Sequence, residues 1–145
     1  MWSEIHGSGT LHVYFAPDLT TKGTPHWWLA SYGLTNNFET EDTSDADGDG
    51  HQAWQEFITG TVPTNKLSVL HVAEQVIVNG TNTLRWPSSL DGAALPYAIQ
   101  KSTDLLNGPW TPVATVPRVL PTNAWSTPAL GTNVFYRIVA TNAVQ

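Results

Sequence analysis

Cysteine is absent from the 145 residues of this chain. Its absence excludes disulfide bonds, thiolate zinc sites and thiol nucleophiles together, but it says little about the compartment. Basic residues are scarce as well, since six Lys and Arg stand against twelve Asp and Glu, for a formal net charge of -6. Because a phosphate-binding surface needs clustered Lys and Arg, this composition argues against nucleic acid as a partner.

Long apolar runs are also missing. No stretch approaches the roughly 18 consecutive apolar residues that a membrane-spanning helix needs, so we expect no membrane insertion. The first twenty residues lack the basic start and the apolar run of a signal peptide. Apolar residues nonetheless make up 41% of the chain, which is enough to build the core of one domain or of two small ones.

The most informative segment runs from Asp45 to Glu56 and reads DADGDGHQAWQE. Its twelve residues meet the side-chain requirements of an EF-hand-type calcium loop at positions 1, 3, 5, 6 and 12. Gly50 permits the sharp turn that brings the side chains to one ion, and position seven supplies a main-chain carbonyl. The sequence therefore predicts a Ca²⁺ site with the ligands Asp45, Asp47, Asp49, His51 through its carbonyl, and Glu56.

The charge around this segment favours an ion over the alternative, which is an ordinary solvated Asp/Gly turn. Residues 39–56 hold seven acidic side chains, and no Lys or Arg occurs between Gly23 and Asn65. Without a cation such a stretch repels itself. Gln52 stands at position eight, where paired EF-hands carry a β-branched apolar residue, and the chain contains no second loop. We therefore expect a solitary site.

Two short helices are expected on either side of this loop. The first begins near Pro25, which suits the first helical position, and ends at Gly33, which suits the position after the C-cap. The second runs from about Gln52 to Thr59, with apolar residues at helical spacing, and ends at Gly60. Residues 34–44 are interpreted as an irregular excursion and not as an entering helix.

The remainder of the chain has the pattern of a β protein. Alternation predicts a short strand at Leu11–Phe15, which either ends a preceding β-repeat or joins the downstream sheet. Turn signals then separate six further strand candidates, as expected for a small antiparallel Ig-like β-sandwich. These candidates are residues 68–78, 82–86, 96–102, 110–116, 123–126 and 134–141. The predicted organisation is an N-terminal strand and linker over 1–22, a helix–calcium loop–helix module over 23–65, and the β-sandwich over 66–145.

Several motifs together resemble a C-terminal module of large bacterial secreted or surface proteins, similar to thrombospondin type 3 and dockerin-like calcium repeats. The resemblance covers about residues 23–140 and is carried by residues 23–30, 32–34, 45–56 and 60–65, and in the later part by 101–105, Trp110 and 135–138. It implies a Trp-rich short helix and one calcium loop followed by a small β-sandwich. Val62 departs from the family pattern, which reads Gly-Thr-Asp-Pro. The single loop does not imply cohesin binding, because a functional dockerin duplicates it.

The leading functional hypothesis is a non-catalytic, calcium-stabilised accessory or spacer module, located outside the cell or on its surface. Its partners would be the adjacent domains of a longer parent protein. An alternative is a carbohydrate-binding module, because the chain holds seven Trp, of which Trp86, Trp110 and Trp125 fall near predicted strand ends and can stack on polysaccharide. A second alternative is a metal-dependent hydrolase of esters or phosphoesters with His51 beside the ion, although no hydrolase motif is present.

Overall fold

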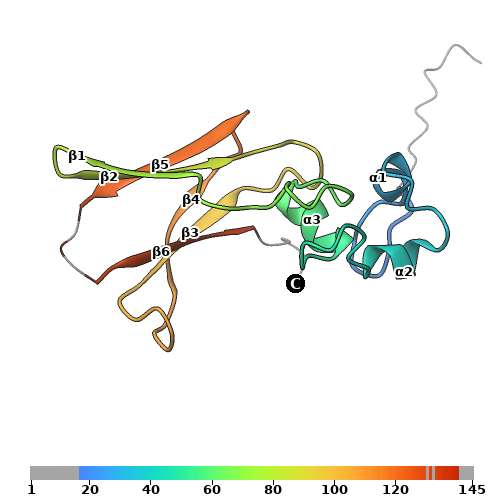
Figure 1. The fold of residues 1–145 in the computed structure, drawn as a ribbon, viewed down its shortest axis with the longest axis horizontal. Helices are drawn as coiled ribbons and strands as arrows, with labels where there is room; N and C mark the ends of the chain where they lie inside the picture. Colours follow the sequence, from blue (N-terminus) through green and yellow to red (C-terminus); the bar gives the residue numbers. More distant parts are fainter. Residues whose placement is uncertain (1–16, 130, 132, 141–145) are drawn as a thin grey trace, which may run out of the picture.

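The computed structural model describes residues 17–129, 131 and 133–140. Over these residues the chain is mainly β: three short helices come first, and six strands follow in two antiparallel sheets. Figure 1 shows the helices gathered at one end of the two sheets. The strand predicted at Leu11–Phe15 lies outside the described residues.

The helices pack around a small apolar core of their own. They are α1 (His26–Ser31), α2 (Phe38–Asp42) and α3 (Ala53–Thr59). The core contains Trp28, Leu29, Leu34 and Ala53, with Tyr32, Phe38 and Phe57 packed against it. The expected helices near residues 25–33 and 52–59 are thus present. Gly33 and Gly60 follow them with φ of 78° and 76°, the left-handed conformation that glycine adopts without strain.

Helix α2 corrects the prediction that residues 34–44 form an irregular excursion. Its N-cap is Asn37, whose side chain accepts a hydrogen bond of 3.1 Å from the Thr40 amide. Glu39 and Glu41 lie in its first turn, where the positive end of the helix dipole favours acidic side chains. The helix ends at Asp42, so a helix does lead into the acidic loop that begins at Asp45.

All six predicted strands are found, with boundaries that differ by a few residues. One sheet has the order β1 (Glu74–Val78), β2 (Thr81–Pro87), β5 (Thr122–Pro128), and the other has the order β4 (Thr111–Val116), β3 (Tyr97–Ser102), β6 (Phe135–Ala140). Every pairing is antiparallel. The first strand is shorter than expected, because residues 68–73 are not in a strand.

The second core lies between the two sheets. Leu84 and Trp86 alternate with exposed residues on β2, and they meet Tyr97 and Ile99 from β3. The rings of Trp86 and Tyr97 pack edge to face, with centroids 5.6 Å apart. This alternation is what a sheet with one buried face requires, and it fixes the register of the central strands. A second edge-to-face pair also joins the two sheets: Trp125 of β5 and Tyr136 of β6, with ring centroids 5.3 Å apart.

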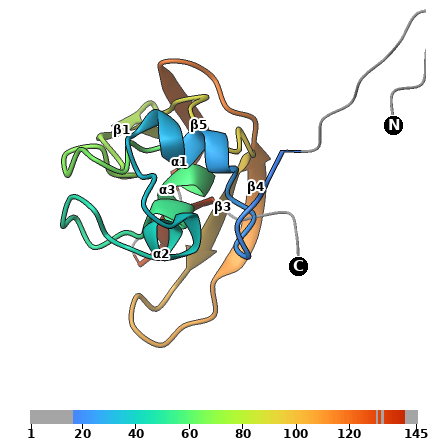
Figure 2. The same ribbon diagram turned by 90° about the vertical axis from the view of Figure 1, so that its right-hand side faces the viewer.

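The helices cover one end of the two sheets. Figure 2, turned by 90° from Figure 1, shows α1 and α3 in front of the strand ends, with α2 below them. The C-terminal end of α3 contacts the loops that connect the strands, through hydrogen bonds from Ala93 and Arg118. Among the residues that the structure describes, no helix is long and apolar enough to cross a membrane.

Candidate metal centre

The loop between α2 and α3 draws three carboxylates together. One oxygen from each of Asp45, Asp47 and Asp49 lies within 4.8 Å of the others. Gly48 and Gly50 have φ of 78° and 96°, and these left-handed positions curl the chain around the carboxylates. Among the described residues, this is the one group of three or more His, Cys, Asp or Glu side chains with that geometry.

The main chain of the loop holds the first aspartate in place. Asp45 accepts hydrogen bonds from the amides of Gly48 at 2.8 Å, Asp49 at 3.2 Å and Gly50 at 3.0 Å. The amide of Ala53, at the start of α3, donates to the carbonyl of Ser44 at 3.0 Å and closes the base of the loop. All these bonds join residues that are close in the sequence, so the turn is built from local contacts.

Asp47 and Asp49 each use one oxygen in the turn and leave the other without a partner. Asp47 Oδ1 accepts from the Asp49 amide at 3.1 Å, and Asp49 Oδ1 accepts from the His51 amide at 2.7 Å. The Oδ2 atom of each is buried and has no hydrogen-bond partner. A buried carboxylate oxygen without a partner destabilises the folded state, so a bound cation or a hydrogen-bond donor would stabilise both atoms.

Glu56 adds a third buried oxygen without a partner. Its residue is 1% exposed, its Oε1 accepts a long hydrogen bond of 3.4 Å from the Thr61 hydroxyl, and its Oε2 has no partner. Burial, followed by the negative charges of Asp47 and Asp49, raises the pKa of Glu56 to about 8. Glu56 lies outside the 4.8 Å group of aspartates but is close enough to be affected by their charge.

The ring of His51 lies beside Asp49, at the solvent-exposed side of this cluster. Its side chain is 46% exposed, whereas that of Asp49 is 2% exposed, and its ring Nδ1 lies 3.2 Å from Asp49 Oδ1. The ring nitrogen is engaged by Asp49, and the ligand that the sequence predicts from His51 is its main-chain carbonyl. The donor set is therefore made of oxygen atoms, and oxygen is what Ca²⁺ prefers over softer metals.

The three tryptophans predicted as sugar-stacking candidates lie in different environments. Trp86 is 0% exposed and belongs to the core between the sheets, so its faces are not available to a polysaccharide. Trp125 is partly buried against Tyr136, in the same core. Trp110 is partly buried, and the guanidinium of Arg137 lies over its ring at 4.5 Å. The structure does not bring the three side chains to one surface.

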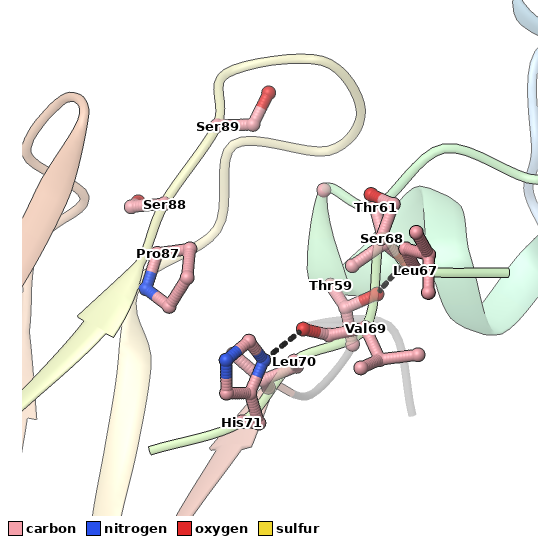
Figure 3. Close-up of a pocket in the computed structure, with 11 residues that line it drawn as sticks. Thr59, Thr61, Leu67, Ser68, Val69, Leu70, His71, Pro87, Ser88 and Ser89 are labelled. Atoms are coloured by element: carbon pink, nitrogen blue, oxygen red, sulfur yellow. Dashed lines mark hydrogen bonds between the residues drawn. The ribbon is translucent and has the colours of Figure 1, made fainter. Parts of the chain in front are cut away.

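A cavity of about 130 Å³ lies between the end of α3 and the segments on both sides of the first sheet hairpin. Figure 3 shows the hydroxyls of Thr61 and Ser68, the ring of His71, and Pro87 and Ser89 around it. The His71 ring Nδ1 is bonded to the carbonyl of Val69 at 2.8 Å. No carboxylate lines this cavity, so it lacks the acid and base pair that hydrolysis usually requires.

No protein-family model, no curated protein and no solved structure matches this chain.

Proposed function

We propose that the chain is a non-catalytic accessory or spacer module that is stabilised by calcium, within a secreted or surface protein of bacteria. The observation that carries this proposal is that three carboxylates of the loop, Asp47, Asp49 and Glu56, each bury an oxygen without a partner. They stand at positions 3, 5 and 12 of the loop, where a calcium ion takes its carboxylate ligands. Asp45 and the carbonyl of His51 would complete the protein ligands, and water would fill position nine, where Ala53 has no donor oxygen.

Calcium would supply the positive charge that this segment lacks. Negative oxygens that are desolvated and close together destabilise the fold unless a cation binds between them. The ion would therefore hold α2, the loop and α3 together. Solitary extracellular loops bind calcium with dissociation constants of about 10⁻⁴ to 10⁻³ M, and this range suits the extracellular location that the resemblance implies.

The resemblance to thrombospondin type 3 and dockerin-like modules supports the same proposal from the sequence. The strand order supports an Ig-like assignment of the two sheets. In Ig domains strands B and E are neighbours in one sheet and strands C and F in the other. Here β2 pairs with β5, and β3 pairs with β6. An experimental structure in which these pairs are exchanged would exclude the Ig-like assignment.

The direct test is thermal unfolding of the chain with calcium and with a chelator. An ion present at 100 times its dissociation constant stabilises a protein by about 2.7 kcal/mol. For a chain of this size, we expect calcium to raise Tm by roughly 5–15 °C relative to the chelator. Magnesium at the same concentration is the control, because it demands a tighter octahedral geometry and gives up its water reluctantly. An equal Tm in calcium and in chelator would leave the loop without a structural role.

A further inference from the structure

The C-terminal end of α3 is capped by groups from strand β3 and from the β2–β3 and β4–β5 loops. The last carbonyls of a helix have no partner within the helix and must find donors elsewhere. The carbonyl of Phe57 accepts from the Ala93 amide at 2.9 Å, and that of Thr59 accepts from the Tyr97 hydroxyl at 3.3 Å. The guanidinium of Arg118 donates to the carbonyls of Ile58 and Thr59, the latter at 2.9 Å.

Arg118 also holds the loop between β2 and β3. Its Nε donates to the carbonyl of Leu95 at 2.6 Å, and its Nη1 donates to the carbonyl of Ser89 at 3.0 Å. The guanidinium lies over the Tyr97 ring, 4.7 Å from its centroid. One side chain from the β4–β5 connection thus fastens the helix and the β2–β3 loop at the same point. Burial lowers the pKa of Arg118 from its ordinary value.

The same helix carries the closing residue of the acidic loop. Glu56 comes directly before Phe57, whose carbonyl accepts from the Ala93 amide of the β2–β3 loop. The carbonyl of Glu56 itself accepts from the amides of Gly60 at 2.7 Å and Thr61 at 3.0 Å. Any rotation or shift of α3 that carries the Glu56 carboxylate toward or away from the aspartates must therefore also move the carbonyls that Arg118 holds.

We propose that Arg118 is a positioning residue for the calcium site, which fixes α3 so that the Glu56 carboxylate faces Asp47 and Asp49. This inference rests on the proposed function. It has a reciprocal consequence, because two coupled equilibria must strengthen each other by the same factor. If the Arg118 contacts strengthen calcium binding, calcium must in turn strengthen the Arg118 contacts and order the β2–β3 loop.

Calorimetric titration with calcium tests the first half of this proposal. We expect Arg118→Met to raise the dissociation constant for calcium at least about fivefold, the lower end of ordinary coupling between sites. The dissociation constant of Arg118→Lys should lie between those of the wild-type chain and Arg118→Met, because an ammonium group keeps the charge but cannot reproduce the planar guanidinium. Arg85→Met is the matched control and should leave the affinity unchanged: Arg85 is an exposed arginine of β2 that pairs with Glu74 at 2.6 Å.

Amide hydrogen exchange tests the second half. The Ala93 amide lies in the β2–β3 loop, and its only described partner is the Phe57 carbonyl of α3. We expect calcium to slow the exchange of this amide in the wild-type chain and in Arg85→Met. In the Arg118 variants calcium should slow it much less. A residue that merely contributed to global stability would change all core amides alike and would not remove this response selectively.

The outcomes separate the inference from the proposed function. A folded Arg118→Met or Arg118→Lys variant with wild-type calcium affinity would overturn the role of Arg118 and leave the calcium site standing. So would an Ala93 amide in the wild-type chain that ignores calcium while calcium binds. Absence of calcium binding by the wild-type chain would remove both proposals. If Arg118→Met does not fold, the calcium titration of Arg118→Lys and the hydrogen exchange of the Ala93 amide in the wild-type chain test the role of Arg118.

Discussion

The hydroxyl of Thr20 donates a hydrogen bond of 2.6 Å to the carboxylate of Asp42, although 22 residues separate them. Both residues are buried, and the Thr20 oxygen also accepts from the Thr24 amide at 3.1 Å. Asp42 is the last residue of α2, the helix that leads into the acidic loop. The segment before α1 is therefore fastened to the start of the candidate metal centre.

Replacing Thr20 by Val tests this fastening. The substitution keeps the shape of the side chain but removes both the donor to Asp42 and the acceptor for the Thr24 amide, so it leaves two buried groups without these partners. The expected loss of unfolding free energy is about 1–3 kcal/mol, measured by urea denaturation. Thr21→Val is the control, because Thr21 is exposed and bonds Glu39 through its amide and not its side chain. Equal midpoints for the two variants would contradict the assigned role.

Glu56 makes the calcium-free chain sensitive to pH. Its pKa is about 8 in the folded chain, against an ordinary value of 4.5, so the folded state holds a proton that the unfolded state releases. By linkage, stability is then highest below the ordinary value and falls as the pH rises toward 8. We expect urea midpoints in chelator to decrease over that range. Glu56→Gln, which has no proton to lose, should flatten the dependence.

Asp47→Asn should change stability in opposite directions with and without calcium. In chelator the substitution removes one of several crowded negative charges and retains the acceptor for the Asp49 amide, so the variant should be more stable than the wild-type chain. In calcium it loses a charged ligand and should bind about tenfold or more weakly. In thermal unfolding, the Tm of the variant should therefore lie above that of the wild-type chain in chelator and below it in calcium.

Asp104→Asn is the control for the charge change in that experiment. Asp104 lies in the β3–β4 loop, where its Oδ1 accepts from the amides of Leu106 and Asn107, and an asparagine can keep both bonds. The difference in Tm between Asp104→Asn and the wild-type chain should be the same with and without calcium. If the sign of this difference also changed with calcium, net charge and not the acidic loop would explain the result for Asp47→Asn.

Gly60→Ala tests the contact between α3 and Arg118 by a comparison of two glycines. Gly60 and Gly80 have nearly equal φ, 76° and 74°, so an added methyl group strains both backbones alike. At Gly80 it would meet nothing within 4 Å, whereas at Gly60 it would collide with the Arg118 guanidinium and approach the Ser89 carbonyl at 3.1 Å.

We therefore expect Gly80→Ala to cost about 1–2 kcal/mol of unfolding free energy and Gly60→Ala clearly more. Urea denaturation of both variants gives the difference, which reports the collision of the added methyl group with Arg118 and its close approach to the Ser89 carbonyl. Equal losses would indicate that the guanidinium moves aside without cost, and the packing at the end of α3 would then be looser than the distances suggest.

Local patterns in the sequence were sufficient for much of this structure. The aspartates at 45, 47 and 49 come together through hydrogen bonds that span at most five residues, so their spacing predicts the turn. The strand candidates at residues 82–86 and 96–102 were likewise found from the turn signals on either side of them. In both cases the information lies within a short window of the chain.

The parts that the sequence did not predict depend on distant partners. Helix α2 has only five residues, too few to be stable alone, and its last residue is held by Thr20. Arg118 stands in a loop with no pattern around it, and its carbonyl partners are 23 to 60 residues away along the chain. Nor does any local signal separate the buried Trp86 from the partly exposed Trp110.

Every hydrogen-bond acceptor that Arg118 uses is a main-chain oxygen. Such acceptors are present whatever side chain stands at Ile58, Ser89 or Leu95, so the junction tolerates sequence drift at those positions. A saturation screen for calcium-dependent folding should therefore find one intolerant arginine surrounded by permissive neighbours. In distant relatives this junction would then be traceable through a single basic residue after the fourth strand, even where the surrounding loops have lost all similarity.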